Sequence, residues 1–106
     1  MTILLTTQDR FEDREIAETL GLVRGNTIRA RHLGKDIQAL FRMIVGGEVT
    51  EYTKMLAESR EQAIDRMVDA AEDLGADAIV CMRFSTSAVA QGAAELLAYG
   101  TAVKLK

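Results

Sequence analysis

The fold is decided by the stretch Leu74-Gly75-Ala76-Asp77-Ala78-Ile79-Val80, which changes from helical to strand chemistry within a few residues. Gly75 can take the positive φ that ends a helix, since it has no β-carbon to resist that conformation. The alanines on either side of Asp77 allow the helix end to pack closely against a sheet, and Asp77 can accept hydrogen bonds from backbone N–H groups in the turn. We therefore predict a helix that ends at Leu74 and a strand that begins at Asp77.

A long amphipathic helix is predicted over Thr50 to Leu74. Thr50 is a suitable N-cap residue, and Glu51 follows it in the first turn. Apolar residues then recur at intervals of three, four or seven, which is the pattern of a helix that lies on a sheet. The predicted stripe consists of Tyr52, Leu56, Ala63, Met67, Ala70 and Leu74, widened by Met55, Ile64, Val68 and Ala71.

Two strands are predicted after the junction. The first covers Asp77 to Ser87, and its residues Ala78 to Met82 are apolar at successive positions, which is typical of a strand covered on both faces. We interpret Ser85 to Gly92 as the far end of that strand or as a loop. The last strand is predicted over Ala94 to Leu105, where large apolar residues alternate with small ones.

Before the long helix, a short strand is predicted at Thr2 to Thr7 and a loop at Gln8 to Glu15. Ile16 to Arg31 is interpreted as one long strand, or two strands, bent at Gly21 and Gly25. The buried face of this segment is predicted to consist of its even-numbered apolar residues Ile16, Leu20, Leu22 and Ile28.

A second helix is predicted over Leu33 to Val45, because its apolar residues follow helical spacing and Gly46-Gly47 supplies a C-terminal cap. The predicted order is therefore β-β-α-α-β-β. We expect a single α+β domain over residues 1–106, with an antiparallel or mixed sheet on which the long helix packs.

Composition narrows the classes of function. Charged residues make up 27% of the 106 positions and the net charge is −3, which disfavours a nucleic-acid-binding surface. No segment resembles a membrane helix or a secretory signal, and the chain has one cysteine, so we expect a cytoplasmic protein. Aromatic residues make up only 5%, and a small aliphatic core gains from further burial between subunits.

Six segments in order along the chain carry a family resemblance. They are Leu5-Thr6-Thr7; Gly21-Leu22-Val23-Arg24-Gly25; Ile44-Val45-Gly46-Gly47; Tyr52 with Leu56, Arg60 and Ala63; Leu74 to Val80; and Tyr99-Gly100-Thr101-Ala102-Val103. On these segments the chain resembles the YbjQ-like family of uncharacterised bacterial proteins, which is labelled for heavy-metal binding. The resemblance implies an α+β subunit that assembles into a ring, a homopentamer. It also implies glycine at the position where this chain has Cys81.

A heavy-metal site built from soft ligands needs several thiolates or imidazoles around one ion. This chain has one cysteine, Cys81, and one histidine, His32, with no short-spaced metal motif. One subunit therefore cannot build a closed site from these residues alone, although a ring could contribute one copy from each subunit. The alternatives are that Cys81 is a buried packing residue and that His32 is a surface residue among arginines.

Oxygen ligands are the other metal-binding candidates. Glu61, Asp65 and Asp69 recur every four residues along the long helix, so their side chains are neighbours. Like charges at that spacing repel one another. This repulsion could be reduced by solvent, by basic residues of the same or a neighbouring subunit, or by a bound divalent cation.

No catalytic constellation is visible in the sequence. Cys81 lies in an apolar run that disfavours the thiolate, and neither a phosphate-binding loop nor a dinucleotide motif is present. The function predicted from the sequence is a homo-oligomeric binding or scaffold module without an assigned cofactor. The alternatives are a metal-binding protein with a site between subunits and an enzyme with an active site at the subunit interface.

Overall fold

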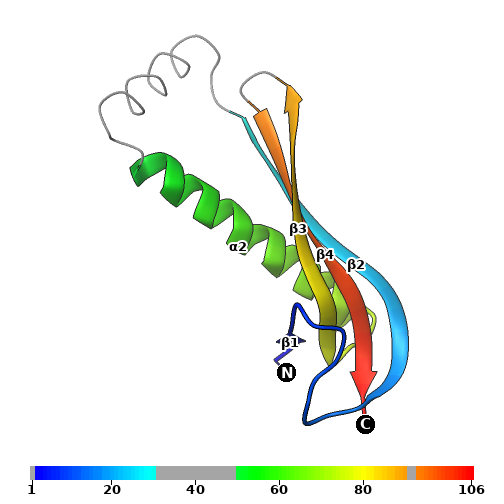
Figure 1. Cartoon of the computed structure of the whole chain (residues 1–106). Coiled ribbons are helices and arrows are strands. Elements are labelled where there is room, and N and C mark those ends of the chain that lie inside the picture. Colours follow the sequence, from blue (N-terminus) through cyan, green and yellow to red (C-terminus); the bar gives the residue numbers. More distant parts are fainter. Residues whose placement is uncertain (1, 31–49, 91–92) are drawn as a thin grey trace.

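The structure is a computed structural model that describes residues 2–30, 50–90 and 93–106 (Figure 1). Its four-stranded sheet has the order β1-β3-β4-β2, and one long helix, α2, lies across a single face of it. The elements are β1 (Leu4–Leu5), β2 (Ile16–Ala30), α2 (Thr50–Asp73), β3 (Ala78–Ala90) and β4 (Ala93–Leu105).

The sheet is mixed. β4 pairs antiparallel with both β2 and β3, whereas the short β1 runs parallel to β3 and pairs only with Ala78 and Ile79. The α+β class and the long helix packed on a mixed sheet are therefore confirmed. The predicted helix over Leu33 to Val45 and the candidate ligand His32 lie outside the described residues.

The helix-to-strand junction has the predicted form. Gly75 has a φ of +76°, and α2 ends two residues before it. Asp77 acts differently from the prediction, because its carboxylate accepts a hydrogen bond from the backbone N–H of Leu105 at 2.9 Å. The side chain thus ties the start of β3 to the end of β4 instead of bonding within its own turn.

Two strand lengths differ from the predictions. β1 is confined to Leu4–Leu5, although the residues that follow stay hydrogen-bonded to β3 through the backbone of Thr6 and Gln8. β3 extends to Ala90, so the polar stretch after Ser85 is the far end of the strand and not a loop. Antiparallel pairing with β4 continues along this stretch, and that long-range pairing maintains a strand whose small side chains bury little surface.

The buried face predicted for β2 is wrong over most of the strand. Val23, Gly25 and Thr27 face the helix and are buried, whereas Leu22 and Ile28 are 65% and 60% exposed. The physical reason is a register shift between Thr19 and Gly21, since an extra residue in a strand reverses which positions face the core. Gly21 has the positive φ of +132° at this irregularity.

Small residues bring α2 very close to β2. A β-carbon at Gly25 would collide with the Ala63 carbonyl, the Met67 amide and the Arg66 β-carbon. Gly25 therefore does not bend the strand as predicted; it permits the helix to touch the strand backbone. Beside it, the buried hydroxyl of Thr27 donates to the Ser59 carbonyl at 3.3 Å.

The apolar stripe of α2 is confirmed in its C-terminal half, where Ala63, Met67 and Ala71 are fully buried. Leu56 and Leu74 were predicted to belong to this stripe, but they are 36% and 47% exposed. They lie near the ends of the helix, beyond its close contact with β2. The side chains of Tyr52 and Met55 lie outside those that the structure describes.

Two apolar clusters occupy opposite faces of the sheet. The larger one lies between α2 and the sheet and includes Met67, Ile79 and Ala102. The smaller one contains Val80, Val103 and Leu105 on the other face, and Phe11 from the N-terminal loop packs against it. The expectation that the start of β3 is covered on both faces is thereby confirmed. No helix among the described residues is long and apolar enough to cross a membrane.

Candidate functional site

The candidate site is a β-bulge in β3, immediately after the junction. Val80 faces Thr101 and Arg83 faces Tyr99, so two residues, Cys81 and Met82, occupy the space opposite Gly100. Cys81 has a φ of 56°, the one positive φ among described residues other than glycine. A bulge residue in this left-handed conformation is commonly glycine. The bulge therefore gives a physical reason for the glycine that the family resemblance implies at this position.

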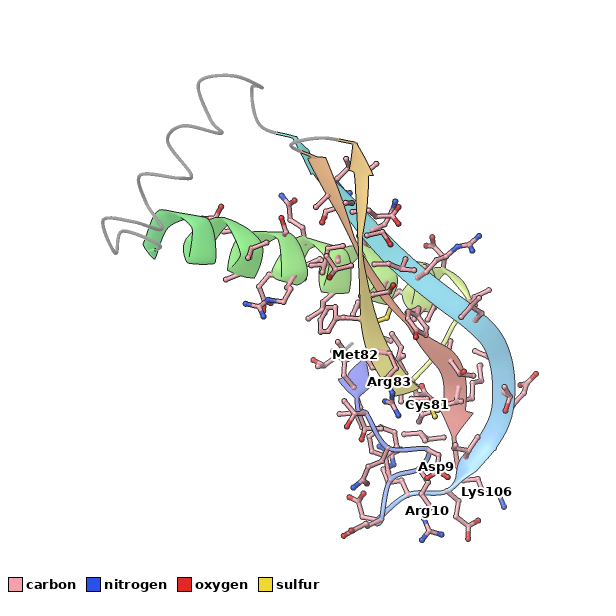
Figure 2. The ribbon with its side chains drawn as sticks, turned by 45° about the horizontal axis from the view of Figure 1, so that its top comes forward. Asp9, Arg10, Cys81, Met82, Arg83 and Lys106 are labelled. Atoms are coloured by element: carbon pink, nitrogen blue, oxygen red, sulfur yellow. The ribbon has the colours of Figure 1, made fainter. Side chains whose placement is uncertain are left out.

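The bulge also anchors the N-terminal loop. The Cys81 N–H donates to the Gln8 carbonyl at 2.9 Å, and the Met82 N–H donates to the Thr6 carbonyl at 3.1 Å. Arg83 adds a clamp, because its Nη1 donates to the carbonyls of Thr7 at 2.7 Å and Met82 at 2.8 Å. Figure 2 shows Cys81, Met82 and Arg83 in succession along β3, close to the loop.

Sequence reasoning missed Arg83. Its acceptors are backbone carbonyls, one of them 76 residues away at Thr7. Every residue has a backbone carbonyl, so the residue types in the sequence do not indicate which one accepts a hydrogen bond. A signal was nevertheless present, because Arg83 directly follows the apolar run of β3. A cation at that position needs either solvent or acceptors nearby.

The sulfur atoms at the bulge do not form a common site. Cys81 is half-buried and packs against the cluster that contains Val80 and Val103, whereas Met82 packs against the cluster beneath α2. The two side chains are therefore directed to opposite faces of the sheet. Within one chain, the Cys81 side chain is partly buried and packs against apolar residues, as the interpretation of Cys81 as a packing residue requires.

The acidic candidates Glu61, Asp65 and Asp69 are exposed on α2. Within residues 2–30, 50–90 and 93–106, no three His, Cys, Asp or Glu side chains come together in a way that could hold a metal ion. A soft heavy metal needs converging thiolates or imidazoles. Thus the described part of a single subunit does not fit a closed heavy-metal site.

The opposite end of the loop forms an open concavity near the C-terminus. Figure 2 places Asp9, Arg10 and Lys106 at this end of the molecule. Lys106 closes the loop through an ion pair with Glu15 at 3.1 Å and a backbone hydrogen bond to the same residue. The concavity has a volume of about 930 Å³ and is lined by residues 10–16 alone. It is formed by the N-terminal loop and by Ile16, the first residue of β2.

The fold and the bulge define a class of small α+β domains in which a long helix covers one face of a mixed sheet. The chain belongs to the YbjQ_1 family, described as "Putative heavy-metal-binding", which matches residues 3–106. The resemblance found in the sequence is therefore confirmed. The family description names metal binding and no catalytic activity.

Curated relatives extend over nearly the whole chain. A UPF0145 protein of Methanococcus vannielii is 62% identical over 104 residues, which is 98% of this chain and 99% of the relative. UPF0145 proteins of Archaeoglobus fulgidus and Clostridioides difficile are 57% and 55% identical, each over 98% of this chain and over 96% and 93% of their own lengths. The family therefore includes archaeal as well as bacterial members.

The fold is also seen in the solved structure of a Pediococcus pentosaceus protein with unknown function from the DUF74 family, with a TM-score of 0.69 and 16% sequence identity. The similarity covers 98% of both chains. At this identity the likeness establishes the α+β fold and nothing about activity.

Proposed function

We propose that this chain is the subunit of a homo-oligomeric binding or scaffold module that acts in the cytoplasm. A closed ring, a homopentamer, is the assembly implied by the family resemblance. The observation that carries the proposal is the outer edge of β3 beyond Arg83. This edge has the properties of a surface that another chain covers.

The edge begins where the N-terminal segment ends its contact with β3. β1 pairs with Ala78 and Ile79, and carbonyls of the N-terminal segment accept hydrogen bonds from the N–H groups of Cys81 and Met82. No described strand pairs with the outer edge from Phe84 to Ala90. The sequence of this stretch is Phe-Ser-Thr-Ser-Ala-Val-Ala, without a charged residue. Exposed edges in monomers are usually protected by charges, prolines or bulges. This stretch has no charge and no proline, and its register shift lies at its far end between Ala88 and Ala90, which supports pairing with another subunit.

The shape of the subunit supports the same proposal. Its radius of gyration is 17.2 Å and its long dimension is 53 Å. A compact domain of this length has a radius of gyration of about 13 Å. An elongated subunit exposes more surface than a compact one of the same length, and association with further copies would cover part of that surface.

A metal site between subunits is the second candidate, and the family description favours it. Such a site would use Cys81 or His32 from several copies, because one subunit supplies only one of each. Elemental analysis of the assembled protein, purified without an affinity tag, tests this candidate. Bound metal that is lost in Cys81→Ser or His32→Ala would support it, and assembled protein without metal would contradict it.

The edge can be tested with a single added charge. Ser87→Lys places a lysine in the uncharged stretch of β3, whereas Gln8→Lys adds the same charge to an exposed loop as a control. If β3 is covered by another subunit, Ser87→Lys should shift the protein from the assembled to the monomeric form in light scattering after size exclusion. The control should assemble like the wild type. Equal assembly of all three proteins would contradict the proposed role of this edge.

A further inference from the structure

The sheet has an open face, which we define as the face turned away from α2. Leu22 and Ile28 of β2 lie on it and are the two most exposed large apolar residues among those described. Arg24 lies between them on the same face, because its neighbour Gly25 faces the helix. The described residues that cover the smaller cluster do not extend to this part of the sheet.

Arg24 is an exposed cation on the open face. Strand register places Arg24, Tyr99 and Arg83 in one row across the sheet. Arg83 is held by the carbonyls of Thr7 and Met82, whereas Arg24 forms no hydrogen bond or ion pair with another described residue. The neighbours of Arg24 along this face are Leu22 and Asn26, and the Asn26 amide donates to the Glu95 carboxylate at 3.3 Å. The exposed Arg24 guanidinium is a suitable contact for a carboxylate-bearing surface.

The outer face of α2 has the complementary charge. Ala63 and Met67 are fully buried against the sheet, and a residue two positions away lies about 200° around the helix. Glu61, Asp65 and Asp69 therefore point away from the sheet of their own subunit. None of the three forms an ion pair within the part of the chain that the structure describes.

We propose that the outer face of α2 in one copy packs on the open face of the sheet in the next copy, with the Asp65 region against Arg24. This inference rests on the proposed self-assembly and identifies two surfaces that would form the contact. A second copy is the occupant because the chain itself carries both complementary surfaces. Its net charge of −3 opposes association in general, so contacts between copies require local complementarity of this kind.

The proposed contact has a definite symmetry. It joins two different surfaces, a helix and a sheet face, so it is head-to-tail and generates a ring when the rotation between copies closes. The outer face of α2 and the open face lie on opposite sides of the sheet, so a single partner cannot complete both contacts in a two-fold dimer. Thus the contact supports a ring in preference to a dimer.

A charge-swap cycle tests the pairing. Arg24→Glu and Asp65→Arg each place like charges in the contact, whereas the double variant restores opposite charges with the positions exchanged. Each single variant should raise the concentration at which half of the subunits are assembled by at least about tenfold in analytical ultracentrifugation. The double variant should return to within about threefold of the wild type. In 0.5 M salt the differences should shrink, because charge attraction is screened.

Matched controls separate this pairing from the net charge. Arg14→Glu and Glu12→Arg make the same charge changes in the exposed N-terminal loop and should leave assembly unchanged. If the wild type assembles but the single variants match their controls, or the double variant is not restored, the helix-to-sheet contact is wrong and the self-assembly proposal stands. If the wild type is monomeric, both proposals are wrong.

Discussion

Gly25 and Ala63 are in direct backbone contact, because the absence of a side chain at Gly25 lets the Ala63 carbonyl of α2 reach β2. This contact sets the distance between the helix and the sheet. Val23 and Thr27 flank Gly25 on the same face of β2 and are buried with it. The helix in turn leaves the other sheet face available for a neighbouring copy.

Replacement of Gly25 by alanine should separate the helix from the sheet. The added β-carbon would lie against backbone atoms of Ala63 and Met67, which cannot move as a flexible side chain does. We expect Gly25→Ala to lower the free energy of unfolding by at least about 2 kcal/mol in urea denaturation. Glu18→Ala, at an exposed position of the same strand, is the control and should change it by less than about 0.5 kcal/mol. Equal effects of the two substitutions would contradict the close contact.

Cys81 should prefer glycine to alanine. Both substitutions remove the thiol, but only glycine relieves the positive φ at this position. A left-handed residue with a β-carbon costs about 1–2 kcal/mol, so Cys81→Gly should be about 1 kcal/mol more stable than Cys81→Ala. In an ordinary strand the order is reversed, with alanine favoured by about 0.5–1 kcal/mol. Urea unfolding of the two variants decides between these orders.

Asp77 should stabilise the sheet through an acceptor and not through its charge. Asp77→Ala leaves the Leu105 N–H without its partner, and the cost should be about 1–3 kcal/mol. Asp77→Asn keeps a side-chain carbonyl oxygen and should cost clearly less. Thermal unfolding of both variants measures the difference. An asparagine variant as unstable as the alanine variant would mean that the carboxylate charge is the stabilising feature.

The Thr27 hydroxyl should contribute to the attachment of α2 to β2. Thr27→Val keeps the side-chain shape but removes the hydrogen bond to the Ser59 carbonyl. We expect a loss of about 0.5–1.5 kcal/mol in the free energy of unfolding. The same substitution at Thr101 removes a half-buried hydroxyl for which no hydrogen bond is found among the described residues, and it serves as the control. If Thr101→Val costs as much as Thr27→Val, the hydrogen bond has no measurable effect.

Much of the fold was predictable because it depends on patterns among residues that are close together in the sequence. The helix stripe around Ala63 and Met67, the cap at Gly75 and the apolar start of β3 depend on residues near one another in sequence. The buried face of β2 was not predictable in the same way. It depends on a register shift against β4 near Gly21, and the pairing partner of a strand is not visible in the strand's own pattern.

In the candidate site, too, the features that depend on nearby residues were predictable and those that depend on strand pairing were not. The departure from glycine at Cys81 was visible in the sequence, but the conformation that explains it arises from pairing with β4 around Gly100. The clamp by Arg83 was missed because its partners are loop carbonyls. Ligand chemistry alone predicts that one chain has too few cysteines and histidines for a closed soft-metal site, but it could not place Cys81 and Met82 on opposite faces.

The central claim is that copies of this chain assemble into a closed oligomer. Native mass spectrometry at micromolar concentration tests this claim most directly. The account predicts one closed assembly of identical subunits, with five copies as the expected number. Its population should fall for Ser87→Lys and for Arg24→Glu, and should recover in the Arg24→Glu, Asp65→Arg double variant. A spectrum that contains only monomer would contradict the account.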